Sequence, residues 1–194
     1  MNKTFRALAL SACLSAVAAT AQAATATAVF AGGCFWCIEA DFEKLAGVTG
    51  VESGYTAGKT ANPTYEQVSN GHTGHTEAVR VIYDPAKVSY AELVEYFWRH
   101  IDPTVKDRQF CDIGSQYRSG IYWGSPAERQ VVEASRDALL KSGRFKAIHT
   151  ELAPASTFYL AEDYHQDYYK KNSVRYNYYR YSCGRDARVK SLWQ

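Results

Sequence analysis

The sequence predicts one domain of the α+β class, in which helices and strands form a two-layer sandwich. Short apolar or alternating runs, typical of strands, are interspersed with longer runs that carry helix-start signals. No internal repeat, low-complexity tract or linker divides the chain. The 171 residues that follow the first 23 of the 194 are enough to bury one hydrophobic core.

The expected elements follow the chain in a β-α-β order that continues to its last third. Strands are expected where apolar runs end at glycine, proline or Asp-Pro, namely at Thr27–Ala31, Gly47–Thr56, Glu77–Tyr83, Gly120–Trp123 and Thr150–Ala153. Helices are expected at Phe35–Leu45, Tyr90–His100, Pro126–Lys141 and Ala161–Lys171, and a single helical turn is considered at Thr64–Ser69. Two of them have clear start signals, a Ser89/Glu92 capping box and a Ser125-Pro126 pair. Asp102–Arg118 is predicted to be a long polar loop, and Asn172–Gln194 a tail without a clear period.

The first 23 residues match a secretory signal peptide. Lys3 and Arg6 precede an uncharged apolar run, and residues 21–23 (AQA) have the pattern of a cleavage site. We therefore expect cleavage after Ala23, a domain over residues 24–194, and export to a bacterial periplasm. Alternatively, Leu10–Cys13 resembles a bacterial lipoprotein box. Without a lipid on Cys13, no stable membrane association is expected.

Charge gives no indication of a nucleic-acid partner, and none is expected. Lys3 and Arg6 account for the whole net charge of +2, so the chain after Ala23 carries 20 basic and 20 acidic residues. The charge is nevertheless uneven, because seven Lys/Arg and only one acid, Asp186, lie from Lys170 onward. We expect this basic tail to be held against an acidic body rather than to bind a polyanion.

The stretch from Gly32 to Cys37 has the layout of a reactive thiol site. Two glycines end the first strand, and Cys34 follows them at the start of the first helix. Backbone N–H groups at a helix N-terminus are unpaired and the dipole favours an anion, so a Cys34 thiolate would be stabilised there. From spacing alone, Cys34 and Cys37 fit a structural disulfide or half of a zinc site as well.

Four cysteines remain beyond the signal peptide, and their roles are open. Cys34, Cys37, Cys111 and Cys183 allow three full pairings. Disulfides are common in exported proteins, but a domain of this size does not need them to fold, so a redox role stays open. Cys111, next to Phe110, is expected to be a small buried residue without a part in the chemistry.

Glu77 is the most informative polar residue. The alternation of its strand places it on one face with Val79 and Val81, so a carboxyl group is the first side chain on an otherwise apolar face. If Glu77 is buried, its pKa rises and it can act as an acid near neutral pH. If the strand end frays, Glu77 is simply solvated.

Other polar residues are less informative by themselves. Tyr65 and Tyr117 lie in expected loop or turn segments, where each could merely pack over the core. His72 and His75 make a zinc site conceivable, but their spacing is not that of a helical zinc-protease pair. We therefore expect no metal and no other cofactor.

Several blocks resemble the peptide methionine sulfoxide reductase A family, in family order. The first, Gly33–Glu39 (GCFWCIE), resembles the GCFWxxE signature of that family. The others are Gly54–Thr56, Asn62–Tyr65, Thr73–Val79, Tyr83–Pro85, Asp112–Ser119 (DIGSQYRS) and Ala161–Gln166 (AEDYHQ), so the resemblance covers about residues 28–193. It implies a ferredoxin-like two-layer sandwich with extended coil segments. It also implies thiol-dependent reduction of methionine S-sulfoxide, free or in proteins, in repair of oxidative damage.

The resemblance also implies a role for each matching residue. Cys34 matches the nucleophile and Glu77 the catalytic acid. Tyr65 and Tyr117 match the hydroxyls that hydrogen-bond the sulfoxide oxygen, and Asp112 an acidic residue of the same pocket. Phe35 and Trp36 match the apolar pocket for the S-methyl group.

These assignments agree with the chemistry that a sulfoxide requires. Its oxygen leaves only when protonated, so attack needs a thiolate on sulfur and a proton on oxygen together. A helix N-terminus contributes about 0.3–1 kcal/mol, less than the roughly 1.36 kcal/mol of one pKa unit. We therefore expect Glu77 to be protonated at rest, and Cys34 to ionise only when substrate is bound.

The product on Cys34 is a sulfenic acid, which condenses with a second thiol. Cys183 lies where the family has a C-terminal resolving cysteine, and we expect its glycine-flanked tail to swing toward Cys34. Cys37 is the alternative resolving residue, one helical turn from Cys34. The family implies recycling of the resulting disulfide by a thioredoxin-like reductant, and we expect a monomer.

Two other classes of function remain as alternatives. A periplasmic CxxC thiol–disulfide oxidoreductase would exchange disulfides without any sulfoxide. A disulfide-stapled or metal-binding structural domain would have no free thiol, or bound zinc. Reduction of methionine sulfoxide with a dithiol separates all three.

Overall fold

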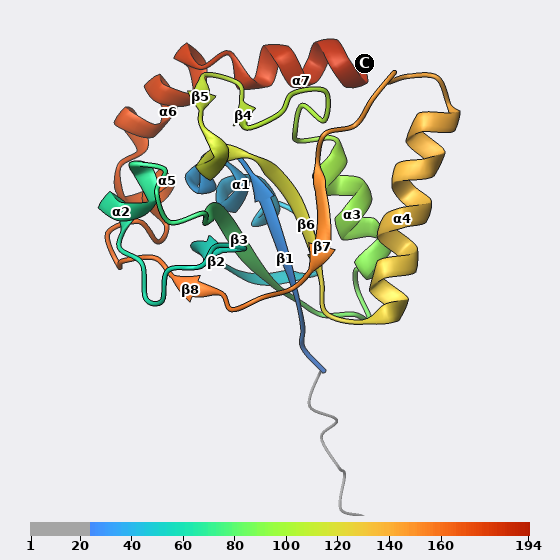
Figure 1. Cartoon of the computed structure of the whole chain (residues 1–194), viewed down its shortest axis with the longest axis horizontal. Helices are drawn as coiled ribbons and strands as arrows, with labels where there is room; N and C mark the ends of the chain where they lie inside the picture. The colour runs from blue at the N-terminus through green and yellow to red at the C-terminus, as the bar shows by residue number, and fades with distance from the viewer. Residues whose placement is uncertain (1–23) are drawn as a thin grey trace, which may run out of the picture.

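A six-stranded sheet runs through the middle of the molecule, and helices pack around it (Figure 1). The computed structural model describes residues 24–194, so the expected signal peptide, its cleavage site and Cys13 lie outside the described residues. The sheet order is β7-β6-β1-β3-β2-β8, and only β6 and β7 pair in parallel. The α+β class expected from the sequence is confirmed. The strands are β1 (Ala26–Gly32), β2 (Val48–Thr56), β3 (Thr76–Tyr83), β6 (Ser119–Trp123), β7 (Glu151–Pro154) and β8 (Tyr159–Leu160).

The helices begin where the sequence places capping residues. The Ser89 side chain accepts from the Glu92 N–H, while the Glu92 carboxylate accepts from the Ser89 N–H, which is the expected capping box. Ser125 likewise caps α4. No helix among residues 24–194 is long and apolar enough to cross a membrane. The helices are α1 (Phe35–Phe42), α2 (Tyr65–Ser69), α3 (Tyr90–Trp98), α4 (Pro126–Lys141), α5 (Tyr168–Lys171), α6 (Ser173–Ser182) and α7 (Arg185–Trp193).

The main core lies between the sheet and the helices α1 and α3. Phe30 of β1 stacks on Phe42 of α1 at 4.9 Å between ring centroids and on Phe97 of α3 at 5.1 Å. Val79 and Val81 of β3 are fully buried in the same cluster, as the alternation of this strand predicts. This packing fixes the ends of β1 and β3 against the start of α1.

Two sequence-based expectations were wrong because side chains make long-range contacts. The expected loop at 102–118 contains a hairpin, β4 (Arg108–Gln109) with β5 (Asp112–Ile113), and a short 3-10 helix η1 (Ser115–Tyr117). The expected helix at 161–171 is helical only over Tyr168–Lys171. Gln166 instead forms hydrogen bonds with both the N–H and the C=O of Ser53, and Glu162 accepts from the Tyr65 N–H. The segment before Tyr168 is therefore bound to β2 and α2 and is not helical.

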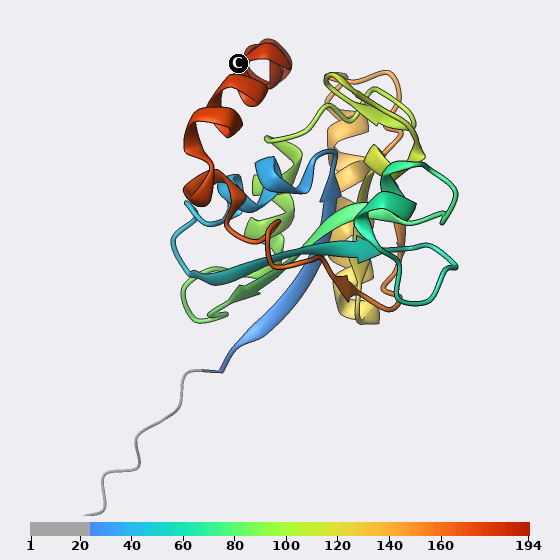
Figure 2. The same ribbon diagram turned by 90° about the vertical axis from the view of Figure 1, so that its left-hand side faces the viewer.

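The C-terminal tail is also more ordered than its lack of a period predicts. It forms α6 and α7, which lie along the α1 side of the molecule (Figures 1 and 2). Gly184, between them, has a φ of +66°, a left-handed conformation that suits glycine and changes the chain direction. The expectation of a freely swinging tail is therefore wrong for this structure.

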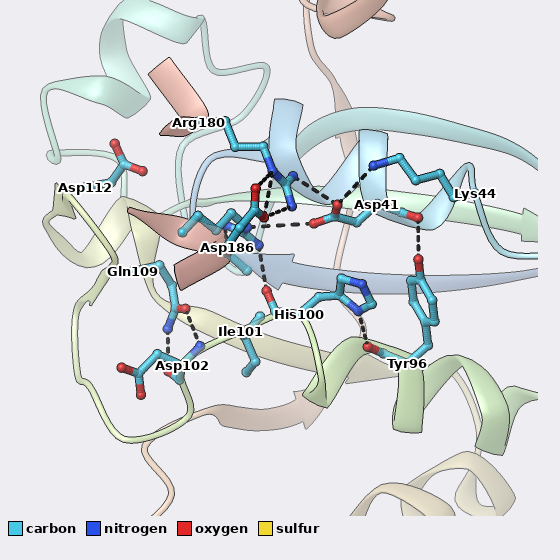
Figure 3. Close-up of polar contacts among 12 residues, drawn as sticks. Asp41, Lys44, Tyr96, His100, Ile101, Asp102, Gln109, Asp112, Arg180 and Asp186 are labelled. Atoms are coloured by element: carbon cyan, nitrogen blue, oxygen red, sulfur yellow. Dashed lines mark hydrogen bonds and ion pairs between the residues drawn. The ribbon is translucent and has the colours of Figure 1, made fainter. Parts of the chain in front are cut away.

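Ion pairs to two buried carboxylates, Asp41 and Asp102, hold the tail on the body. Arg180 reaches from α6 to Asp41 of α1, with 2.9 Å between its Nη1 and Oδ1, and also pairs with Asp186 (Figure 3). Arg185 is 2% exposed, and its Nε lies 3.7 Å from Asp41 Oδ2. Arg188 pairs with Asp102. These contacts agree with the expected basic tail held against an acidic body.

Replacing Asp41 with Asn should destabilise the fold strongly. The substitution keeps the side-chain shape but leaves Arg180 and buried Arg185 without their shared carboxylate. Removal of one member of a buried ion pair costs about 3–5 kcal/mol, so we expect the free energy of unfolding in urea to fall by about that amount.

The matched control is Lys44→Met. Lys44 is the third cation near Asp41, but its side chain is 65% exposed. Its loss should therefore cost less than about 1 kcal/mol. Equal stability of D41N and the wild type would contradict the assigned importance of the buried network.

Candidate active site

Cys34 lies where the sequence predicts, between the end of β1 and the start of α1. It is the N-cap residue of α1, with non-helical dihedral angles (φ −49°, ψ 118°). Gly33 before it has a φ of +83°, and a Cβ there would lie 2.5 Å from the side chain of Gln109. Only glycine fits this turn, which places the Cys34 thiol at the helix N-terminus.

Glu77 is buried directly beside this helix start. Its Oε2 accepts a hydrogen bond from the Phe35 N–H at 3.0 Å, and the residue is 2% exposed. Burial raises the pKa of Glu77 to about 8, and the negative charge of Asp112 adds to this, although the bond from Phe35 opposes it. Glu77 is therefore protonated at neutral pH, as expected for the case in which its side chain is buried rather than solvated.

Seven of the predicted residues line one cavity of about 70 Å³ with Cys34 at its wall. They come from α1, α2, β3, β5 and η1, which meet at one end of the sheet. An eighth lining residue, Tyr179 of α6, was not predicted. The lining residues are Cys34, Phe35, Trp36, Tyr65, Glu77, Asp112, Tyr117 and Tyr179.

The tyrosines of this cavity remain proton donors. Burial raises the pKa of Tyr65 to about 12 and that of Tyr117 still further, and the nearby Glu77 contributes to both shifts. Tyr179 donates from its hydroxyl to Asp112 Oδ2 at 2.5 Å. Burial raises the pKa of Asp112 in turn. Within residues 24–194, the hydroxyl groups of Tyr65 and Tyr117 donate to no carboxylate, unlike those of Tyr179 and Tyr55.

The aromatic walls are fixed from the C-terminal part of the chain. Trp36 stacks on Tyr168 with 3.7 Å between ring centroids, and its Nε1 donates to His165 Nδ1 at 3.0 Å. Phe35 is buried and stacks against Tyr65. Sequence reasoning missed His165 and Tyr168 as supports. The Ala161–Gln166 block, which contains His165, was the available signal.

Cys34 and Cys37 are both free and buried, and each thiol affects the pKa of the other. Burial raises the pKa of Cys34, and the nearby groups Cys37, Glu77 and Asp112 raise it further. The interaction with Cys34 lowers the pKa of Cys37, and the positive charges of Arg185 and Arg180 add to this effect. The two thiols are therefore shifted in opposite directions, with Cys37 the more acidic of the two.

Cys183 does not lie with Cys34 in this structure. It forms a disulfide with Cys111, with 4.9 Å between their Cα atoms. Cys111 is exposed in the β4–β5 turn, so the expectation of a small buried residue was wrong. The reason is that the turn projects Cys111 toward the C-terminal end of α6, where Cys183 is the C-cap residue.

His75 is used within the protein fold. Its Nδ1 accepts from the Gly58 N–H at 3.1 Å, and its Nε2 lies 2.7 Å from the Thr60 carbonyl oxygen. Both ring nitrogens therefore face backbone groups, and neither faces Cys34 or Cys37. This geometry does not favour the alternative of a zinc site shared with those thiols.

Known proteins resemble this chain over nearly all of the described part. Residues 26–194 match the family model of peptide methionine sulfoxide reductase. Peptide methionine sulfoxide reductase MsrA 2 of Caulobacter vibrioides is 50% identical over 186 residues, covering 94% of each chain. Reduced Mxr1 from Saccharomyces cerevisiae has a TM-score of 0.72 and 32% identity over 77% of this chain and 86% of that one. Methionine sulfoxide reductase A of Corynebacterium diphtheriae has a TM-score of 0.69 and 39% identity, over 79% and 77%.

The comparisons and the site geometry point to the same chemistry. A cysteine at a helix N-terminus, a carboxyl group with a raised pKa and two tyrosine hydroxyls share one small aromatic cavity. The chain therefore belongs to the peptide methionine sulfoxide reductase family, of the MsrA type, and reduces methionine sulfoxide.

Proposed function

We propose that the cavity at Cys34 reduces the S epimer of methionine sulfoxide, with Cys34 as nucleophile and Glu77 as acid. The observation that carries this proposal is the buried Glu77 carboxyl group. It accepts the N–H of the residue after Cys34 and shares the cavity with that thiol. An acid with a pKa of about 8 holds a proton at neutral pH and can give it to a bound sulfoxide oxygen.

The steps follow from this geometry. Cys34 Sγ attacks the sulfoxide sulfur while the Glu77 proton moves to the sulfoxide oxygen. The attack forms a bond between Cys34 Sγ and the substrate sulfur. The hydroxyl group then passes from the substrate sulfur to Cys34 Sγ, so that the sulfur–oxygen bond and the new sulfur–sulfur bond both break. Cys34 is left as a sulfenic acid, and methionine leaves as a thioether. Two electrons pass from Cys34 to the substrate, and Glu77 regains the proton that the Cys34 thiol gives up.

The other cavity residues stabilise the transition state. The Tyr65 and Tyr117 hydroxyls donate to the sulfoxide oxygen, in the manner of an oxyanion hole. Phe35 and Trp36 surround the S-methyl group and exclude water, which strengthens those hydrogen bonds. Asp112 acts indirectly, because it holds the Tyr179 hydroxyl at the cavity wall.

The reductant and the substrates are part of the same proposal. The family resemblance supports action on free and protein-bound methionine sulfoxide, with recycling by a thioredoxin-like dithiol protein. The yeast relative Mxr1 has also been solved in complex with Trx2. The burial of Cys34 and Cys37 does not favour the alternative of a general CxxC disulfide oxidoreductase, which must present its dithiol to proteins.

Export, oligomeric state and the finer fold assignment are further proposals. The signal-like residues 1–23 support export to a periplasm, with a lipid on Cys13 as the alternative, and the site in one chain is compatible with a monomer. The order β6-β1-β3-β2, with α1 and α3 between successive strands, supports a ferredoxin-like sandwich. Mass spectrometry of the protein from a bacterial periplasm would test export. A mature chain that begins at Ala24 supports it, and a full-length cytosolic chain contradicts it.

Cys34→Ser should abolish the reduction of methionine S-sulfoxide with dithiothreitol as reductant. The hydroxyl group of the substituted serine is a far weaker nucleophile than a thiolate, so no methionine should form above background. Methionine R-sulfoxide serves as the control substrate and should not be reduced by the wild type. Methionine formation by C34S would remove Cys34 from the mechanism.

Glu77→Gln should slow the first turnover strongly and remove its pH dependence. General-acid catalysis contributes about 10²–10⁴-fold, so we expect a loss of that order in rapid-quench measurement of methionine release. The wild-type rate should fall as the pH rises through about 8, because Glu77 then loses its proton. Glu52→Gln is the matched control, since Glu52 pairs with Arg80 on the sheet away from the cavity. A wild-type rate and pH profile in E77Q would rule out the assigned acid.

A further inference from the structure

Gln116 is a buried amide that joins the two elements on which the cavity tyrosines Tyr65 and Tyr117 lie. Tyr65 is the first residue of α2, and Tyr117 is the last residue of η1. Gln116 directly precedes Tyr117 in η1 and is 8% exposed. Its Nε2 donates a hydrogen bond to the carbonyl oxygen of Ser69, the last residue of α2, at 2.9 Å. Among residues 24–194, this is the one hydrogen bond between α2 and η1.

We propose that Gln116 is a positioning residue for the reaction, whose side chain holds α2 against η1 so that the Tyr65 and Tyr117 hydroxyls reach the same sulfoxide oxygen. This inference rests on the proposed function, in which both hydroxyls donate to that oxygen. Gln116 is not among the residues that line the cavity. It therefore acts through the tyrosines and does not touch the substrate.

The η1 side of this link is fixed to the strand that carries the acid Glu77. Thr76 is fully buried and directly precedes Glu77 in β3. Its Oγ1 lies 3.2 Å from the carbonyl oxygen of Gln116 and 3.1 Å from that of Arg118, the two residues on either side of Tyr117. The Thr76 hydroxyl can donate to either carbonyl group. Tyr117 is therefore held relative to Glu77 without any help from the Gln116 side chain.

The α2 side depends on the Gln116 side chain to a greater degree. α2 has five residues, about one and a half turns, so its own hydrogen bonds do little to fix its orientation. At its start the Tyr65 N–H donates to Glu162 Oε1 at 2.8 Å, and in its middle Val68 is buried in the core. Gln116 holds its end at Ser69. Without that third contact, α2 is free to rotate about the first two, and the Tyr65 ring moves with it.

The Gln116 amide is closely packed between the end of α2 and the start of η1. A Cβ on Gly71 or on Gly114 would lie 3.4 Å or less from Gln116 Oε1. Gly71 follows α2, and its N–H donates to the Val68 carbonyl oxygen at 2.8 Å, whereas Gly114 is the N-cap residue of η1. The amide thus contacts both elements at once, as expected for a group that sets the spacing between them.

The spacing of the two hydroxyls matters because their effect on a developing oxyanion depends steeply on distance. Both tyrosines line the cavity of about 70 Å³. Burial raises the pKa of Tyr117, and the nearby Glu77 and Tyr65 add to this shift. A donor is effective only at about 2.7–3.1 Å from the oxygen, and a misplacement of about 1 Å can cost about 10²-fold in rate. Loss of the Gln116 bond should therefore affect the rate directly.

Gln116→Met tests the proposal, because methionine has a similar length but no N–H to donate to Ser69. The fully reduced chain is mixed with methionine S-sulfoxide, and methionine release in the first turnover is followed by rapid quench. At saturating substrate we expect Q116M to be about 10–100-fold slower than the wild type. The half-saturating concentration should change by less than about twofold, since the hydroxyls act in the transition state. A wild-type rate in Q116M would overturn the proposal.

The same substitution in two tyrosine variants separates positioning of Tyr65 from a general loss of structure. In Tyr117→Phe, Q116M should slow the first turnover by the same factor as in the wild type, because the Tyr65 hydroxyl is still present and is misplaced. In Tyr65→Phe, Q116M should change the rate by less than about twofold, because the hydroxyl that Gln116 positions is gone. A tenfold or larger effect of Q116M in Y65F would reduce Gln116 to a structural residue and contradict the proposal.

Gln67→Met is the matched control. Gln67 is an exposed glutamine of the same helix, and its Oε1 accepts from the Thr64 N–H at 3.0 Å in the capping box. Its loss weakens α2 without touching η1, so the first turnover should stay within about twofold of the wild type. A Q67M variant as slow as Q116M would mean that any weakening of α2 suffices, against the specific role of Gln116.

The single tyrosine variants distinguish failure of this proposal from failure of the proposed function. A slow Y65F together with a wild-type Q116M would leave the proposed function intact and overturn the role of Gln116 alone. A wild-type first turnover in Y65F would contradict the donor role of Tyr65 in the proposed function, and the role of Gln116 with it. If circular dichroism shows that Q116M does not fold, Gln116→Glu replaces it, because a carboxylate keeps the side-chain shape and cannot donate to Ser69.

Discussion

The burial of one carboxylate, Asp41, beneath two arginines is the constraint on which the rest of the structure depends. Asp41 lies on α1, the helix that begins at Cys34, while Arg180 and Arg185 come from the last two helices. Ions in a buried position stabilise a fold only when each charge is compensated. The first and last helices must therefore pack together, and this brings the cavity wall of α6 over the catalytic turn.

A second buried carboxyl group, Glu77, lies in the opposite electrostatic surroundings. Asp41 has cations beside it, whereas Glu77 accepts from a backbone N–H and shares its cavity with Asp112, and no residue that lines this cavity is a cation. Its proton is therefore retained. The two sides of α1 thus differ in electrostatic character, with an acid that keeps its proton on the Cys34 side and cations on the Cys37 side.

Local sequence patterns predicted the features that depend on neighbouring residues. The glycine turn before Cys34, the alternation that places Glu77 inside, and the Ser89 cap each involve residues a few positions apart. Tyr65, Tyr117 and Asp112 could be proposed only through the family resemblance, since fifteen tyrosines offer no local criterion for choosing among them. The cavity later brought all three together.

The features that could not be predicted depend on contacts between residues that lie far apart in the sequence. Tyr179 reaches Asp112 across 67 residues, and His165 reaches Trp36 across 129. The segment before α5 loses its helix because Gln166 is used by the Ser53 backbone. Cys111 was misjudged for the same reason, because four cysteines do not disclose which two the fold will bring together.

The stacking of Trp36 on Tyr168, and the position of Tyr179 above the cavity, have a consequence for the synthesis of the protein. Cys34 is made early, whereas Tyr168 and Tyr179 lie near the end of the sequence, so a nascent chain carries Cys34 without these two parts of its enclosure until most residues have been made. During that interval the thiol lacks the walls that Tyr168 and Tyr179 provide. The cavity wall is thus complete only when the C-terminal helices have docked.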